Sequence, residues 1–354
     1  MKPFPRRYKT LTALLMIASM LLLSACGVGK EENPESNAAV THSPEEPHKV
    51  KIQLLWVPQA QFAGIFAAKD KGFYEEEGID IEIIPGGPDI VAEQQVANGV
   101  ADVGITAVDS LLVNRDKGIP LVSIAQISQK NSKYLIAKKS TGIDSPEKMK
   151  GKKISAFMGG KQFPVVAFLE KNGINPEKDV HLVKQGFTMD QFFNDQVDVS
   201  TVTSYNEFNV VKANGITESD LYTFSIEEAG IGMLEDTLIA RKEWIENNRD
   251  LAVKVVRATL KGWNYAIEHQ DEAVEIMMAN VVEGSTTKEH QATMLKEMAK
   301  LVKPEGFTES QTGMFVEDSY KRTAEIALKY GLIEKPADVK SAYDESIYKE
   351  AVKQ

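Results

Sequence analysis

The chain has few of the residues that form disulfides or hold metal ions, since its 354 residues include one cysteine, Cys26, and five histidines. One cysteine cannot form a disulfide within the chain. No two of the histidines have the spacing of metal ligands; they are His42, His48, His181, His269 and His290. No Gly-x-Ser-x-Gly, Walker or His-Glu-x-x-His motif is present. We therefore expect no metal, no cofactor and no catalysis.

An apolar run at the amino end, residues 11–23, follows a positive head formed by Lys2, Arg6, Arg7 and Lys9. This run is shorter than the roughly 20 residues that cross a bilayer as a helix. A charged head before a short apolar segment is typical of a secretory signal peptide. We assign residues 1–25 to that signal.

The signal ends in Leu-Ser-Ala-Cys at residues 23–26, which resembles the lipobox of bacterial lipoproteins. In a lipobox the cysteine is acylated and becomes the first mature residue, and two or more acyl chains anchor a protein stably. We therefore predict lipidation of Cys26 and a location on the extracytoplasmic face of the cell membrane. The alternative is an ordinary signal peptide with an incidental cysteine. Residues 26–48 are expected to form a flexible tether, because they contain no aromatic and almost no bulky apolar side chain.

Positive charge is scarce in the mature chain. Removal of the signal peptide takes away four basic residues and leaves 37 basic against 51 acidic ones, a net charge of −14. This balance argues against binding to nucleic acid or to the surface of anionic lipid.

The folded part, residues 49–354, is expected to form two lobes, because single cores rarely grow beyond about 250–300 residues. Alternating strand and helix patterns predict an α/β fold. We expect strands at 50–56, 79–84, 101–105, 121–127, 153–157, 180–184, 197–203, 221–225 and 231–240. Helices are expected at 61–77, 89–98, 163–172, 249–268, 271–281, 287–302 and 310–330. The strands are largely apolar, as in sheets that helices cover on both faces.

Distinctive short motifs lie along the first three quarters of this part. They begin with Leu-Trp-Val-Pro-Gln-Ala-Gln-Phe-Ala-Gly at 55–64 and Lys-Gly-Phe-Tyr-Glu-Glu-Glu-Gly at 71–78, and continue at 85–88, 99–105, 184–187, 204–207, 232–236 and 260–263. Together they resemble the substrate-binding lipoproteins of ABC transporters in the superfamily of sulfonate receptors and thiamin-pyrimidine synthases. The formylaminopyrimidine- and riboflavin-binding branches are the most similar. The resemblance covers about residues 49–280.

This resemblance implies a type II periplasmic-binding-protein fold, with two α/β lobes joined by a two-strand hinge. Residues 49–136 and 232–354 would form the first lobe and residues 137–231 the second. The implied role is to capture a small-molecule solute by lobe closure and deliver it to the permease and ATPase of an ABC importer. We expect the protein to act as a monomer.

Loops that follow strands should line the ligand cleft, because open α/β sheets bind ligands at the carboxyl ends of their strands. In the first lobe these loops include Trp56, Gln59 and Phe62, whose rings could pack on a planar ligand or belong to the core. Thr106 ends a strand. Asp109 opens the next helix, where it could bind a polar ligand or simply cap the helix.

In the second lobe, Gly159 and Gly160 lie between a strand and a helix. Their N–H groups could bind an anion or a carbonyl, although a tight turn is a sufficient explanation. Gln162 and Gln185 occupy comparable loop positions and are also candidate ligand-binding residues.

Tyr205, Asn206 and Glu207 follow another strand and are similar to a Tyr-Asn-Glu of the formylaminopyrimidine-binding relatives. The similarity implies polar contacts to a heterocyclic ring. A carboxylate such as Glu207 can accept two N–H bonds from an amino-heterocycle. The alternative is a solvated glutamate at a helix start.

The ligand expected from these residues is a planar nitrogen heterocycle. A sulfonate or nitrate receptor should present basic groups, but the only basic residues near these loops are Lys161 and Lys184. We rank a thiamin pyrimidine precursor of the formylaminopyrimidine type first, followed by riboflavin and then a sulfonate or nitrate. An enzyme like the thiamin-pyrimidine synthases is the rival class, yet those use a cysteine-rich motif, and no cysteine follows Cys26. A surface interaction module is a third class, which would not need a cleft.

Overall fold

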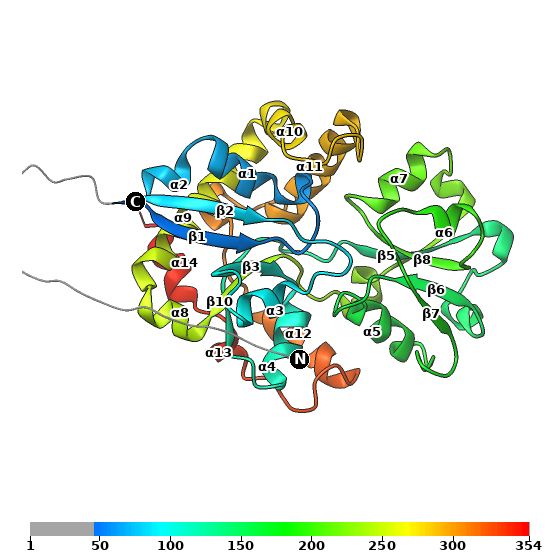
Figure 1. Ribbon diagram of the computed structural model, residues 1–354. Coiled ribbons are helices and arrows are strands. Elements are labelled where there is room, and N and C mark those ends of the chain that lie inside the picture. Colours follow the sequence, from blue (N-terminus) through cyan, green and yellow to red (C-terminus); the bar gives the residue numbers. More distant parts are fainter. Residues whose placement is uncertain (1–45, 354) are drawn as a thin grey trace, which may run out of the picture. The chain divides into compact units, whose positions relative to one another are not determined.

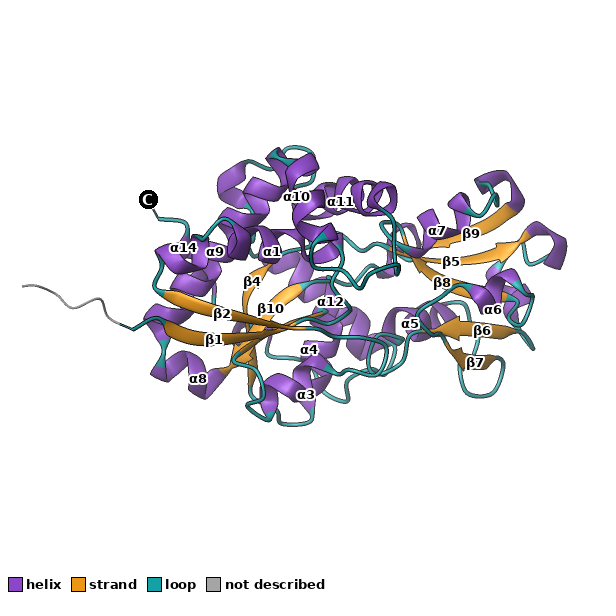
Figure 2. Ribbon diagram, turned by 45° about the horizontal axis from the view of Figure 1, so that its top comes forward, coloured by secondary structure: helices purple, strands orange, loops and turns teal. Residues whose placement is uncertain are grey.

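The computed structural model describes residues 46–353, which form two five-stranded sheets surrounded by helices (Figure 2). The predicted signal peptide, Cys26 and most of the predicted tether lie outside the described residues. No helix in the described part of the chain is long and apolar enough to span a bilayer.

The first sheet has the strand order β2-β1-β3-β10-β4 (Figure 1). Its strands are β1 (His48–Gln53), β2 (Ile79–Ile84), β3 (Val103–Thr106), β4 (Leu121–Gln126) and β10 (Thr237–Arg241). β1 runs parallel to β2 and β3, whereas β10 is antiparallel to both of its neighbours, β3 and β4. The carboxyl ends of β1 and β3 therefore lie at the same edge of the sheet.

Helices cover this sheet because its strands present apolar side chains to both faces. In β10, Leu238 belongs to the large core that α1 (Ala63–Asp70) and α9 (Arg249–Glu268) help to form. The next residue, Ile239, packs with side chains of α3 (Ala92–Ala97) and α4 (Val108–Asp116). Successive residues of a strand point to opposite faces, so this strand is buried on both.

The second sheet has the strand order β7-β6-β8-β5-β9. Its strands are β5 (Lys133–Lys138), β6 (Lys153–Ala156), β7 (His181–Lys184), β8 (Val199–Thr203) and β9 (Leu221–Ser225). Here too the first strands are parallel, since β6 pairs in parallel with β7 and β8, while β5 is antiparallel to β8 and β9. α5 (Phe163–Lys171) packs on one face, and α6 (Asp190–Phe193) and α7 (Glu207–Ala213) on the other.

The chain passes between the sheets twice, from β4 to β5 and from β9 to β10. The two connections are bonded to each other, because the side-chain amide of Asn131 donates to the Met233 carbonyl at 2.8 Å and that of Gln126 donates to the Glu235 carbonyl at 2.7 Å. β5 already belongs to the second sheet, although we expected no strand there and placed the lobe boundary at residue 136.

The helices that remain lie mostly after β10. They are α2 (Phe73–Glu76), α8 (Lys242–Asn247), α10 (Gln270–Met278), α11 (Lys288–Val302), α12 (Glu317–Lys329), α13 (Val339–Ala342) and α14 (Glu345–Ala351).

Several predicted elements are confirmed to the residue, among them the strands at 79–84 and 221–225 and the helix at 249–268. The predicted helix at 61–77 is wrong as one element, because Gly72, with φ of 73°, separates α1 from α2. The last predicted strand, at 231–240, begins only at Thr237. The residues before it form the second connection between the sheets.

α1 and α9 approach each other closely through a pair of glycines. A Cβ atom added to Gly262 would lie 2.1 Å from the carbonyl oxygen of Gly64, and one added to Gly64 would lie 2.2 Å from the indole of Trp263. Trp263 is fully buried. Only glycine allows this distance between the two helices, whose contact supports the segment just before α1.

We predict that Gly262→Ala lowers the free energy of unfolding by about 1–3 kcal/mol, because the new methyl group meets backbone that cannot move aside. In a helix interior alanine is normally more stabilising than glycine by roughly 0.5–1 kcal/mol. A lower free energy of unfolding would therefore show that the steric clash between the helices outweighs this preference. Urea denaturation measures the change. Gly186→Ala is the control, since its Cβ meets nothing within 4 Å. A stabilised Gly262→Ala variant would contradict this account of the packing.

Candidate functional site

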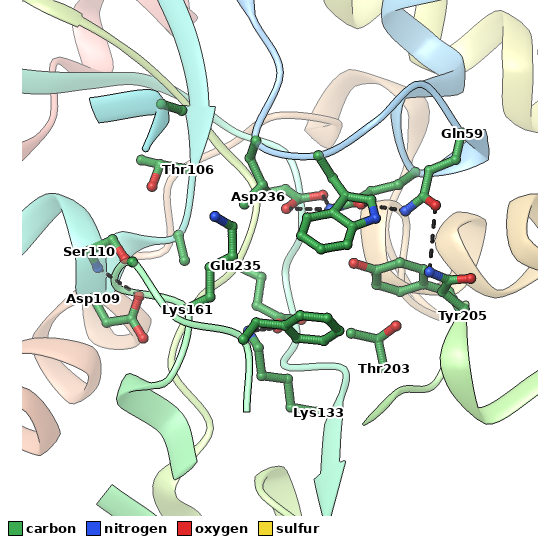
Figure 3. A pocket seen from close by; sticks show the side chains of 18 of the residues that line it. Gln59, Thr106, Asp109, Ser110, Lys133, Lys161, Thr203, Tyr205, Glu235 and Asp236 are labelled. Atoms are coloured by element: carbon green, nitrogen blue, oxygen red, sulfur yellow. Dashed lines mark hydrogen bonds and ion pairs between the residues drawn. The ribbon is translucent and has the colours of Figure 1, made fainter. Parts of the chain in front are cut away.

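A cavity lies where the loops that follow β1, β3, β6 and β8 come together, so both lobes contribute to its wall (Figure 3). Its lining residues are Leu55, Trp56, Gln59, Gln61, Ala92, Glu93, Thr106, Ala107, Asp109, Ser110, Lys133, Phe157, Gly159, Lys161, Thr203, Tyr205, Asn206, Glu207, Glu235 and Asp236. The parallel arrangement of these strands in each sheet brings their carboxyl ends, and hence these loops, to one place.

Aromatic side chains from both lobes meet in the cavity. The ring of Trp56, in the loop after β1, contacts that of Phe157, at the end of β6, edge to face with centroids 5.1 Å apart. Phe187 stacks on the same indole at 6.3 Å. The ammonium group of Lys161 lies 5.9 Å from the indole ring. These contacts give the cavity flat apolar surface next to polar groups.

A buried ion pair forms the wall of the cavity at the two connections between the sheets. The Lys133 ammonium donates to Glu235 at 2.5 Å, and the N–H of Ser132 donates to the other oxygen of Glu235 at 2.7 Å. The Lys133 and Glu235 side chains are 11% and 9% exposed. Burial by itself lowers the pKa of Lys133, but the charges of Glu235 and Asp109 outweigh it and raise that pKa.

Asp236, next to this pair, is held by an amide. The Gln61 side chain donates to both carboxylate oxygens of Asp236, at 3.1 and 3.0 Å, and accepts from the amide of Gln59 at 2.9 Å. Burial, and then the charge of Glu235, raise the pKa of Asp236 to about 7. This carboxyl therefore exchanges its proton near neutral pH.

Glu207 is bonded mostly within its own lobe. One oxygen accepts from the N–H and hydroxyl of Thr203, at 2.9 and 2.7 Å, and the other accepts from the Asn206 amide at 2.9 Å. Burial raises the pKa of Glu207. These bonds secure the turn between β8 and α7, and they occupy the carboxylate that we expected to bind a ligand.

Asn206 connects the two lobes beside the cavity. Its amide nitrogen lies 3.5 Å from the Gln59 oxygen, and its oxygen lies 2.9 Å from Nε2 of His290 in α11. Lys184 also forms an ion pair with Asp89, and Lys161 donates to the carbonyl of Ile90 at 3.0 Å. The lobes therefore contact each other around the cavity.

Asp109 lies in the first turn of α4, at the opposite side of the view in Figure 3 from Tyr205. It is 2% exposed, and Oδ1 accepts from the N–H of Ser110 at 2.6 Å. Burial, which outweighs the positive charge of Lys133, raises the pKa of Asp109 to about 7.

Most of the predicted site residues line the cavity, namely Trp56, Gln59, Thr106, Asp109, Gly159, Tyr205, Asn206 and Glu207. Four do not. Phe62 is packed in the core of the first lobe. Gly160 and Gln162 bond to each other in the turn after β6, and Gln185 is buried between Ser155 and the carbonyl of Thr201.

Sequence reasoning missed the cavity residues that do not directly follow a predicted strand. Lys133 begins β5, and Glu235 and Asp236 belong to the connection before β10. Glu93 comes from α3, where its carboxylate accepts from the hydroxyl of Thr106. Gln61, Ser110, Phe157 and Thr203 adjoin residues that were proposed. Lys161 was noticed only as a basic neighbour. Within residues 46–353 no group of histidine, cysteine, aspartate and glutamate side chains is placed to hold a metal ion.

Two α/β lobes with a shared cavity define the periplasmic-binding-protein fold, as predicted. Solved structures agree: the alkanesulfonate-binding protein SsuA of Xanthomonas axonopodis pv. citri superposes with a TM-score of 0.64 and 13% identity, over 85% of this chain and 99% of that one. Residues 59–273 match the family described as NMT1/THI5 like, and the chain belongs to that family.

Curated relatives include binding proteins and enzymes. The formylaminopyrimidine-binding protein of Halalkalibacterium halodurans is 23% identical over 77% of this chain and 79% of its own length. The riboflavin-binding protein RibY of Chloroflexus aurantiacus is 26% identical over 93% of this chain and 95% of its own length. A 4-amino-5-hydroxymethyl-2-methylpyrimidine phosphate synthase of Legionella pneumophila is 28% identical over 65% of this chain and 72% of its own length.

The buried carboxyl of Asp109 gives a prediction about stability and pH. Its pKa is about 7 in the folded chain against an ordinary value of 3.8, so the folded state binds more protons between these values. This group therefore stabilises the fold less as pH rises from about 4 to about 7, and its penalty is complete above that range.

We expect Asp109→Asn to raise the free energy of unfolding at about pH 8 by an amount on the order of 1–4 kcal/mol, since a pKa unit corresponds to about 1.4 kcal/mol. The gain should vanish below about pH 4, where both states of the wild-type group are protonated. Chemical denaturation at the two pH values tests this. A gain of equal size at both would contradict burial of the charge as its cause.

Proposed function

We propose that the protein is the solute-binding component of an ABC importer, that it is not an enzyme, and that it captures a planar nitrogen heterocycle, with a thiamin pyrimidine precursor of the formylaminopyrimidine type as the first candidate. The observation that carries this proposal is the cavity between the lobes, where aromatic rings adjoin hydrogen-bonding side chains. Such cavities fix a flat molecule by its faces and orient it by its polar edge.

The polar groups of the cavity support a nitrogen heterocycle over an anion. The carboxylates that line it are Glu93, Asp109, Glu207, Glu235 and Asp236, against the lysines Lys133 and Lys161. A sulfonate or nitrate would enter beside this excess of acids, while Lys133 is paired with Glu235 and Lys161 donates to the Ile90 carbonyl. Like charges at short range disfavour such a complex.

The size of the cavity supports a single ring over a larger solute. The space that is open inside it to the centres of water molecules is about 70 Å³, and one water needs roughly 10–15 Å³ of such space. A cavity for a handful of waters suits a substituted pyrimidine. Riboflavin, with three fused rings and a polyol chain, would need the lobes to stand further apart. It remains the second candidate because the similarity to RibY spans nearly the whole chain.

The residues around the cavity give little support to catalysis. The histidine that adjoins the cavity region, His290, is bonded to Asn206, and burial lowers its pKa. The contacts between lobes instead suit a hinge motion, in which solute favours the closed state that a permease recognises. In this proposal the first sheet with its helices forms one moving lobe and the second sheet with its helices the other, with the two connections between the sheets as the hinge.

Binding can be tested by thermal shift and calorimetry on residues 27–354, freed of carried-over ligand. We expect formylaminopyrimidine or hydroxymethylpyrimidine to raise the melting temperature, since a ligand at 100-fold excess over Kd adds about 2.7 kcal/mol. Riboflavin, thiamin, taurine, an alkanesulfonate and nitrate complete the panel.

Trp56→Ala should weaken binding of the active compound at least about tenfold, as expected when a buried aromatic anchor is lost. Trp244→Ala, a change of the same kind on α8 away from the cavity, should leave Kd unchanged. A response to sulfonates alone would refute the choice of ligand and keep the transport role. No response to any compound would refute the cavity as a solute site and favour an interaction module.

We also propose that Cys26 is lipidated and holds the protein on the extracytoplasmic face of the cell membrane. The full chain, expressed in a bacterium supplied with labelled palmitate, should carry the label and sediment with membranes. Cys26→Ser should carry no label and leave the membrane fraction. An unlabelled wild-type protein with the same distribution as the variant would contradict the anchor.

A further inference from the structure

The carboxylates of the cavity differ in how far the protein itself satisfies them. Glu235 is paired with Lys133 and the Ser132 N–H, and Asp236 accepts twice from Gln61. Both oxygens of Glu207 are also occupied. Three of these carboxylates are therefore bonded to other groups of the protein.

Asp109 and Glu93 are less fully satisfied. Glu93 accepts one bond, at Oε1 from the hydroxyl of Thr106. Asp109 accepts one bond from its own helix. Its Oδ1 accepts one bond from the N–H of Ser110, the next residue in the same helix. Its Oδ2 has no hydrogen-bond partner within residues 46–353, although the side chain is almost completely buried and lines the cavity. Figure 3 shows the carboxyl with its single dashed bond to Ser110. Oδ2 is not sealed in the core but opens onto the cavity, so a bound solute can supply its hydrogen-bond partner.

The charged groups that surround Asp109 do not supply that partner. Lys133 of β5 acts on Asp109 from a distance, but its ammonium is bonded to Glu235. Glu235, from the segment before β10, and Glu93, from α3, both act on Asp109 as like charges. Lys161 of the second lobe is bonded to the Ile90 carbonyl. None of these charged groups donates a hydrogen bond to Oδ2, although the charge of Lys133 acts on Asp109 from a distance.

Building on the solute-binding role proposed above, we propose that Asp109 binds a basic ring or amino nitrogen of the solute through Oδ2, and that the complex holds one proton between the two groups. The solute class is thus narrowed to nitrogen bases, such as aminopyrimidines, and excludes heterocycles without a basic nitrogen. Charge-assisted N–H···O bonds are the strongest that a buried carboxylate can make.

This arrangement couples binding to protons in a definite direction. Near neutral pH the empty cavity holds Asp109 partly protonated, because its pKa is about 7. A weakly basic solute is neutral there, so the pair takes up about half a proton near pH 7 and almost none below about pH 6, where Asp109 already carries the proton. At higher pH the carboxyl has lost that proton, so binding must take one from the solvent. Affinity then falls by up to tenfold for each pH unit above 7.

The test is calorimetric titration with 4-amino-5-hydroxymethyl-2-methylpyrimidine at about pH 8, in two buffers of different ionisation enthalpy. The difference in heat gives the number of protons taken up. We expect close to one for the wild-type protein, together with the alkaline loss of affinity.

Asp109→Asn should bind the same compound without proton uptake and with a flat pH profile above 7. Glu82→Gln is the matched control, because it removes one negative charge from an exposed position in β2 and should retain uptake. Asp236→Asn is a second control, because Asp236 is the other cavity carboxyl with a pKa of about 7. The folded variant should retain proton uptake.

The outcomes distinguish the role of Asp109 from the solute-binding role of the protein. Uptake that persists in Asp109→Asn, or that disappears only in Asp236→Asn, overturns the assignment to Asp109. Binding of the pyrimidine with no proton uptake overturns the shared proton and leaves the solute-binding role intact. Tight binding of riboflavin instead, without uptake, likewise refutes the nitrogen base but keeps a heterocycle importer. Failure of every heterocycle to bind refutes both.

Discussion

A buried ion pair between Lys133 and Glu235 is the constraint on which the rest of the site depends. It joins the two connections between the sheets and at the same time forms part of the cavity wall. Removal of one partner would leave a buried charge uncompensated, which typically costs 3–5 kcal/mol. The charge of Lys133 also lowers the pKa of Asp109, but burial outweighs it, and Glu235 acts on Asp109 as a like charge. The electrostatic character of the cavity therefore follows from the way the lobes are connected.

The fold was predictable where local patterns decide it. Strand 79–84 and helix 249–268 have periodic apolar residues and clear boundaries, and both were predicted to the residue. β5 was missed because it is specified by antiparallel pairing with β8 and β9, which follow it by more than sixty residues. Trp56, Thr106 and Asp109 were found because strand ends meet at one edge. Glu235 and Asp236 were missed because they fall inside the strand predicted at 231–240, which begins only at Thr237.

Other predicted site residues do not bind as expected for a different reason, which is the direction or the bonding of their side chains. Phe62 and Gln185 lie in the right loops, but one points into the core and the other satisfies buried hydroxyl and carbonyl groups. Glu207 does line the cavity, yet its bonds to Thr203 and Asn206 show a structural use. The carboxyl groups that keep one oxygen without a partner in the described part of the chain, Asp109 and Glu93, lie on the other lobe. In the proposed binding mode the first lobe would recognise the basic solute, next to the place where Trp56 meets Phe157 of the second lobe.

The most direct measurement is a crystal structure of residues 27–354 with an aminopyrimidine bound. The account predicts the ring in the cavity between the lobes, in contact with Trp56, with a nitrogen within hydrogen-bond distance of Asp109 Oδ2 and the pair of Lys133 and Glu235 intact. A ring held elsewhere, or one bound in the cavity with Asp109 bonded only to Ser110, would contradict it.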